Sequence, residues 1–362
     1  DNVGVGRLAL ASQTIGSQNT AVGFTSGTNL TTGASNAFLG TNAGSGVSTG
    51  SNNVAVGVSA LATSGGGVLH TGGSNVAVGN SAMFSGQIIT GNHNVSIGSD
   101  TLRTLTSGSD NVAIGQNAIN SSGATSGSDN VGIGRNTFRN LTSGKNNVGI
   151  GLNANNLLTS AEGTVSIGFG AGEKNLVGNY TVAIGQSALN LNISADNVAV
   201  GALALGSNTS GGNNTAVGRS ALSSLVGNSN CTALGYFAAR TTTAQDITAI
   251  GSNALALATS GTGNTALGAY AMGSGVTTGD FNTSIGVASG QFLSSGSHNT
   301  LIGTSAGNIL DSGSSNICIG REATLPASTT SNTLSIGSAT YFVATNGAAT
   351  TFRRGKVYDL LI

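Results

Sequence analysis

The fold is predicted by a motif that is clearest at Asn111-Val112-Ala113-Ile114-Gly115-Gln116-Asn117-Ala118-Ile119. Copies of it recur along the chain, and each places a glycine, called the motif glycine below, directly after Val, Ile or Leu. Most intervals between motif glycines are 17 residues long. In each interval a polar segment of Ser, Thr and Gly connects one copy of the motif to the next. Such a fixed period is typical of a solenoid, in which every repeat forms one rung. The motif glycines are Gly6, Gly23, Gly40, Gly57, Gly79, Gly98, Gly115, Gly134, Gly151, Gly168, Gly185, Gly201, Gly218, Gly235, Gly251, Gly268, Gly286, Gly303, Gly320 and Gly337.

The residues before the motif glycine have the pattern of a short strand. The nearest is always Val, Ile or Leu, and the one before it is Gly, Ala, Ser or Cys except at Phe38 and Leu301. Neighbouring strand residues point to opposite faces, so one face is bulky and the other small. Helix is disfavoured because each repeat holds two or three glycines, each costing about 1 kcal/mol relative to Ala. We therefore predict an all-β solenoid of about 20 rungs of about 17 residues, with two short strands per rung.

An asparagine lies four residues before the motif glycine in fifteen of the twenty repeats. The exceptions are Thr164, Thr181, Cys231, Ile247 and Thr333. Asparagines stacked from rung to rung can bond through their side-chain amides, as in ladders of identical residues in stacked strands. We therefore predict a structural ladder that includes Asn53, Asn75, Asn94, Asn111, Asn130 and Asn147.

The strand motif is apolar on both faces, which is typical of a sheet that is covered on both sides. We expect one Ile, one Ala and one Leu or Met of each rung to form a thin core. A single chain would then leave one strand face in water, whereas identical chains packed side by side would bury it. The sequence therefore favours a parallel homotrimer, with a monomer that stacks on another partner as the alternative.

Composition excludes several classes of protein. The 362 residues include 59 Gly and 1 Pro, and charged residues make up 7% of the chain. Recurring Val and Ile with so little charge argue against disorder. The net charge is zero and no basic stripe is visible, so no nucleic-acid partner is expected. No apolar run reaches the roughly 20 residues of a membrane span, so this segment is not expected to insert into a membrane. We divide the chain into a repetitive solenoid at 1–337 and a cap or junction at 338–362.

No catalytic, cofactor or metal site is predicted. His70, His93 and His298 have no partner at metal-ligand spacing. Cys231 and Cys318 lie five rungs apart, roughly 24 Å at the usual strand spacing. That separation exceeds the reach of a disulfide, so both are expected to be buried free thiols.

Candidate receptor contacts lie where the repeat is irregular. The longest interval, Gly57 to Gly79, contains His70, and the long interval that follows contains Phe84. Insertions in solenoids map to loops on one face, often the binding face, although a tolerated bulge is the alternative. After Gly337 a cluster of aromatic and basic residues suits either an end cap or a receptor-binding tip. Its candidate contacts are Tyr341, Phe342, Phe352, Arg353, Arg354 and Tyr358.

Copies such as Asn53-Val54-Ala55-Val56-Gly57-Val58-Ser59-Ala60-Leu61 and Asn264-Thr265-Ala266-Leu267-Gly268-Ala269-Tyr270-Ala271-Met272 resemble the head repeats of trimeric autotransporter adhesins and of related phage tail fibres. The resemblance covers roughly residues 1 to 337. It implies a trimeric left-handed β-roll that is extracellular, on a virion tail or a bacterial cell surface. It also implies a structural shaft that adheres to a glycan or protein receptor.

Two other functions stay open. The chain could be the subunit of a self-assembling extracellular filament, in which terminal rungs stack head to tail. It could also be a tailspike that degrades polysaccharide, which needs two carboxyl groups within about 5 to 10 Å. Only Glu162 and Glu173 fall within one period of each other without an obvious role in a turn. We expect the chain not to be an enzyme.

Overall fold

The computed structural model describes residues 1–64, 69–337 and 339–342. The chain divides into two units, Asp1–Ala195 and Asp196–Ile362, which are described separately here. The described residues of both units form strands and turns and contain no helix. The all-β prediction is therefore confirmed, and each unit is a parallel β-solenoid.

The strands are short and follow the motif. Those of the first unit are β1 (Val3–Val5), β2 (Thr20–Val22), β3 (Ala37–Leu39), β4 (Val54–Val56), β5 (Val76–Val78), β6 (Val95–Ile97), β7 (Val112–Ile114), β8 (Val131–Ile133), β9 (Val148–Ile150), β10 (Val165–Ile167) and β11 (Val182–Ile184). Those of the second unit are β12 (Val198–Val200), β13 (Thr215–Val217), β14 (Thr232–Leu234), β15 (Thr248–Ile250), β16 (Thr265–Leu267), β17 (Thr283–Ile285), β18 (Thr300–Ile302), β19 (Ile317–Ile319), β20 (Thr333–Ile336) and β21 (Ala339–Phe342).

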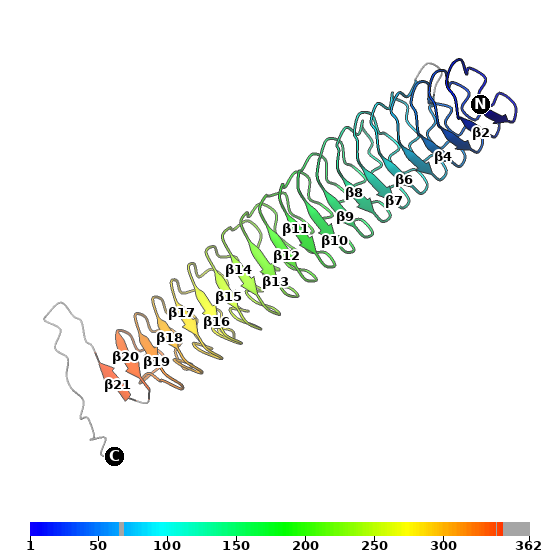
Figure 1. Ribbon diagram of the computed structural model, residues 1–362. Helices are drawn as coiled ribbons and strands as arrows, with labels where there is room; N and C mark the ends of the chain where they lie inside the picture. The colour runs from blue at the N-terminus through cyan, green and yellow to red at the C-terminus, as the bar shows by residue number, and fades with distance from the viewer. Residues whose placement is uncertain (65–68, 338, 343–362) are drawn as a thin grey trace. The chain divides into compact units, whose positions relative to one another are not determined.

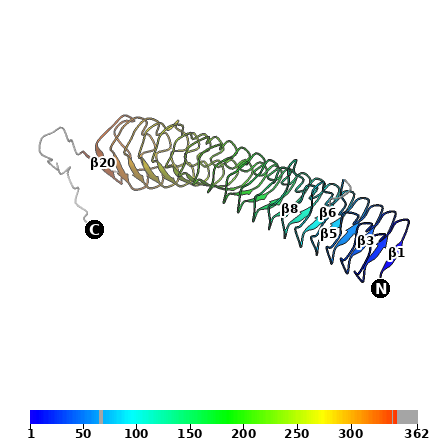
Figure 2. The ribbon, with the colours of Figure 1, turned by 90° about the horizontal axis from the view of Figure 1, so that it is seen from above.

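Equivalent residues of successive rungs pair within each unit. In the first unit β7 and β8 run parallel, with Val112 opposite Val131 and Ile114 opposite Ile133. In the second unit β14 and β15 pair in the same way. Figures 1 and 2 show the strands of the first unit stacked along one side, with the connecting loops on the other. The last strand, β21, differs because it pairs antiparallel with β20.

Each rung holds one strand, so the prediction of two was wrong. After the motif glycine the chain enters turns in which non-glycine residues have positive φ, such as 57° at Asn117 and 47° at Ile119. These left-handed residues end the extended backbone. The turns still bond to their neighbours, because the N–H of Asn117 donates to Ser99 and that of Ile119 to Thr137.

The core differs from the prediction in one column. The small middle residue of the strand points inward, so Ala113 is buried, whereas Val112 and Ile114 on either side are partly exposed. The interior is filled instead from the turns, by Ala118 and Ile119 and by residues such as Leu141, seven after a motif glycine. The Ile of the strand was therefore wrongly assigned to the core. Both strand faces are apolar, so the pattern does not say which of them faces inward.

The motif glycine is required for two reasons, which Gly134 illustrates. Its φ of 131° lies in a region that residues with a side chain rarely adopt. A Cβ atom there would also lie 2.6 Å from the carbonyl oxygen of Gly151, the motif glycine of the next rung. The recurrence of glycine therefore reflects close stacking of one rung on the next.

Candidate functional site

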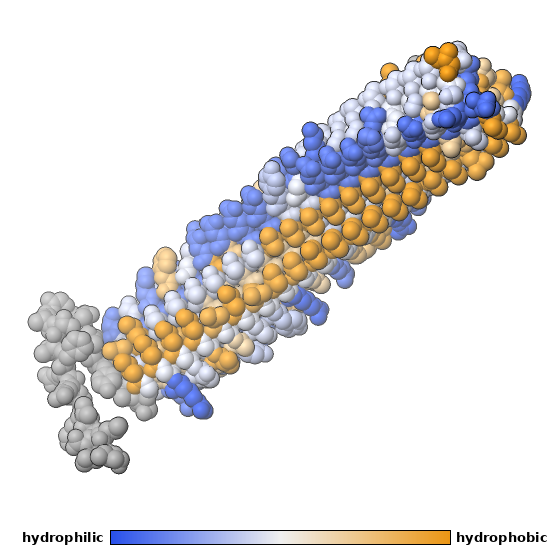
Figure 3. Space-filling model, viewed as in Figure 1, coloured by the Kyte–Doolittle hydropathy of each residue, from blue (hydrophilic) through white to orange (hydrophobic). Residues whose placement is uncertain are grey.

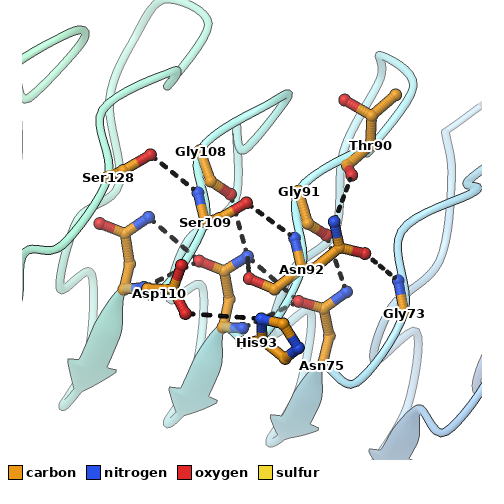
Figure 4. A network of polar contacts seen from close by, with 12 residues as sticks. Gly73, Asn75, Thr90, Gly91, Asn92, His93, Gly108, Ser109, Asp110 and Ser128 are labelled. Atoms are coloured by element: carbon orange, nitrogen blue, oxygen red, sulfur yellow. Dashed lines mark hydrogen bonds and ion pairs between the residues drawn. The ribbon is translucent and has the colours of Figure 1, made fainter.

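The predicted asparagine residues form a buried column in the first unit. The Nδ2 of Asn111 donates to the Oδ1 of Asn94 at 3.0 Å and to the carbonyl oxygen of Gly127 at 2.9 Å. Figure 4 shows the neighbouring step, in which the Nδ2 of Asn75 donates to the carbonyl oxygen of Gly91 at 3.0 Å. The six asparagines from Asn53 to Asn147 are all 1% exposed or less. They are satisfied internally and join rungs together, which is a structural role.

Polar side chains line the turn beside this column (Figure 4). The N–H of Asn92 donates to the Oγ of Ser109 at 3.0 Å, and the N–H of Gly73 to the Oδ1 of Asn92 at 2.7 Å. His93 and Asp110 lie 3.5 Å apart on adjacent rungs, and both side chains are more than half exposed. At such exposure an ion pair contributes little to stability.

His70 was predicted to contact a receptor, but the structure places it in the interior. The residue is 1% exposed. Its Nδ1 accepts a hydrogen bond from the N–H of Ile89 at 3.0 Å, and its Nε2 lies 3.4 Å from the carbonyl oxygen of Ala62. Burial lowers the pKa of His70, and the contact with Ala62 only partly opposes this. His70 therefore fills interior space and presents no surface to a receptor.

Phe84 lies at the surface of the first unit. Its side chain is half-buried, and the guanidinium of Arg103 lies 5.6 Å from the centre of its ring. Arg103 is in turn 3.6 Å from the carboxylate of Asp100, so the charge beside the ring is balanced. Among the predicted contacts whose side chains the structure describes, Phe84 is therefore the one that a ligand can reach.

The other predicted contacts are at the C-terminal end. Tyr341 and Phe342 belong to β21, whose backbone pairs with β20. Phe352, Arg353, Arg354 and Tyr358 lie outside the described residues, so the structure does not place them.

The outer strand face of the first unit is a further candidate surface, although the sequence analysis had assigned its Ile residues to the core. It consists of the first and third residues of each strand, which are mostly Val and Ile. Leu39 is 52% exposed and Ile97 is 40% exposed, and their neighbours in the column are partly exposed. Figure 3 shows these side chains as an orange stripe over the strands. Contiguous apolar surface of this kind marks an interaction site.

The second unit has a chemically different outer face. From β13 to β18 the first strand residue is threonine, as at Thr215 and Thr300, whereas the third stays Val, Leu or Ile. Leu234 and Leu267 are 47% and 42% exposed. This face is half hydroxyl and half aliphatic, so it is a more polar surface than the corresponding face of the first unit.

The remaining reactive groups lie apart. Glu162 forms a parallel β-bridge with Lys145 of the neighbouring rung. Glu173 lies at a different position of its rung, where its carboxylate accepts a hydrogen bond from Asn190 at 3.2 Å. Cys231 and Cys318 are buried and unbonded to each other, as predicted. Burial raises the pKa of Cys231, and it raises that of Cys318 to about 11.

The comparisons with known proteins do not place the chain in a family. No family model matches it, and no curated protein matches it either. Across residues 1–64, 69–337 and 339–342, no helix is long and apolar enough to cross a membrane.

Proposed function

We propose that the chain is a structural fibre and adhesive protein, displayed outside the cell on a virion tail or a bacterial surface. Its partners would be identical chains, in a parallel homotrimer, and a glycan or protein receptor. The observation that carries this proposal is the outer strand face, an aliphatic surface repeated on every rung of the first unit. A repeated surface of this kind suits contact along the length of a partner better than the binding of one small molecule.

A second copy of the chain suits this face for a physical reason. Parallel sheets are normally covered on both faces, and only the inner face of this one is covered by its own chain. Strand neighbours lie about 4.8 Å apart, so two copies carry side-chain columns with the same spacing. Columns with matching spacing can interdigitate along their length, and identical chains that pack in this way around a shared axis form a closed cyclic oligomer. The resemblance to trimeric head repeats supports three chains.

The test is the oligomeric state of the full chain by native mass spectrometry. We expect a trimer for the wild type and a monomer for Val131→Lys/Ile133→Lys, which puts two charges into the outer strand face. The matched control is Gln116→Lys, which adds a charge at an exposed position after the motif glycine and should remain trimeric. A wild-type chain that is monomeric at micromolar concentration would rule out the trimer. Filaments in electron micrographs would favour the head-to-tail alternative.

A further inference from the structure

Rungs two to five of the first unit enclose an open groove with a volume of about 350 Å³. One side is formed by residues two positions after successive motif glycines, Thr25, Asn42 and Ser59. A second row lies three positions later and consists of Thr28, Ser45 and Ala62, and it is called the floor here because Ser45 and Ala62 are nearly buried. Phe84 occupies the next place in the floor column and lines the end of the groove.

Side-chain size explains why the groove lies here. On these rungs the fifth residue after the motif glycine is Thr, Ser or Ala, which leaves space above the backbone. From Phe84 to Asn190 in the first unit the same position carries larger side chains, including Arg103, Asn120 and Arg139. Within the first unit, the groove is therefore confined to these rungs.

The groove offers hydrogen-bonding groups that the protein does not use. The hydroxyls of Thr28, Ser45 and Ser59 make no hydrogen bond with any described residue. Ser45 is 9% exposed, and its hydroxyl lines the floor of the groove where solvent can reach it. Asn42 accepts a hydrogen bond from Thr25 through Oδ1, which leaves its Nδ2 available as a donor. These groups are open to solvent, so a polar ligand in the groove can bond to them in place of water.

We propose that this groove binds a neutral glycan. A sugar ring has a rim of hydroxyls, which match the hydroxyls and amide of the lining, and an apolar C–H face, which can pack on the ring of Phe84. No residue that lines the groove is charged, which disfavours an anionic ligand. The volume falls in the range of small-ligand sites, which begins at about 300 Å³. The proposal names the ligand class for the adhesive role and rests on that part of the proposed function.

The experiment measures binding of the full chain to immobilised lactose, maltose, cellobiose and mannobiose, with sialyllactose as the anionic comparison. We expect at least one neutral probe to bind. Phe84→Ala should lower its affinity about tenfold, because the apolar face of the sugar loses its platform. Ser45→Leu should abolish binding by filling the floor. The matched controls are Phe169→Ala, an exposed aromatic away from the groove, and Ser223→Leu, the equivalent column position in the second unit, and both should bind normally.

Two results would overturn the proposal: binding of none of the neutral probes, or binding that Phe84→Ala and Ser45→Leu leave unchanged. Native mass spectrometry on the same samples separates this outcome from the fibre proposal. If the chain is a trimer but binds no neutral probe, the proposal of glycan binding in the groove is overturned and the trimer stands. If the chain is a monomer that binds a neutral probe and loses affinity with Phe84→Ala, the trimer is overturned and the proposal of glycan binding stands.

Discussion

Asn111 donates both its backbone N–H and its side-chain Nδ2 to the same oxygen, the Oδ1 of Asn94, at 3.0 Å each. Its own Oδ1 accepts the equivalent pair from Asn130, at 3.1 and 3.0 Å. Each buried amide thus bonds to the rung on either side. Removing one of them should break contacts in both directions.

Asn111→Ala should therefore lower the free energy of unfolding by about 2 to 4 kcal/mol, because it leaves buried donors and acceptors unpaired. Urea unfolding followed by circular dichroism measures the change. Asn120→Ala removes a partly exposed asparagine nearby and should cost less than about 0.5 kcal/mol. Equal effects of the two substitutions would show that burial in the column adds nothing.

Gly134→Ala should destabilise the chain by about 3 kcal/mol, because alanine must adopt a φ of 131° and its Cβ meets the oxygen of Gly151. Gly123→Ala is the matched control, since a Cβ atom there lies 3.8 Å from its nearest neighbour, the Cγ2 of Thr142. Urea unfolding of both variants provides the measurement. The explanation fails if Gly134→Ala is as stable as the control.

His70 should make the fold sensitive to acid. Its pKa is lowered in the folded chain, so the unfolded chain binds the proton more readily. The stabilising contribution of neutral His70 is therefore complete above the ordinary pKa of about 6.5 and is lost as the pH falls below it. We expect the thermal midpoint to fall between pH 7 and pH 5, and to fall less in His70→Gln.

His93→Gln serves as the control for that measurement. His93 is exposed beside Asp110, so its removal should leave the acid sensitivity of the wild type in place. An identical pH dependence in His70→Gln and the wild type would contradict the assignment to His70.

The two cysteines should be unreactive in the folded chain. Cys318 has a pKa of about 11, so at pH 8 only about one thiol in a thousand is the reactive thiolate. Cys231 is also buried, with its Sγ 3.4 Å from the carbonyl oxygen of Ala244. Titration with a thiol-reactive chromogenic disulfide should detect both thiols only in denaturant. An added exposed cysteine, Ser252→Cys, should react at once and report that the reagent is active.

Periodicity was sufficient to predict the all-β solenoid, the asparagine column and the need for glycine. These features recur on all or most rungs, so each copy adds to the same signal. The inward side of the strand was not predictable, because Val112, Ala113 and Ile114 are all apolar and either face could be the core. The second strand was wrongly expected because left-handed turns at positions such as Asn117 and Ile119 leave no strong mark in the sequence.

The candidate receptor contacts were predicted from irregular intervals in the repeat. The sequence locates these intervals but does not show whether their side chains point inward or outward. His70 lies in the longest interval, yet its ring turns inward to Ala62 and Ile89. The groove escaped notice because it arises from the same position on several rungs, where Ser45 and Ala62 are small and Phe84 is large.

The groove has a consequence for how such a protein can change over evolutionary time. It follows consecutive rungs with a small residue five positions after the motif glycine, and Phe84 is the first large residue at that position. One substitution at that position opens or closes a segment, while the hydrogen bonds and core of the rung are untouched. Recognition can thus diversify through single mutations, or through gain and loss of whole repeats, without any redesign of the scaffold.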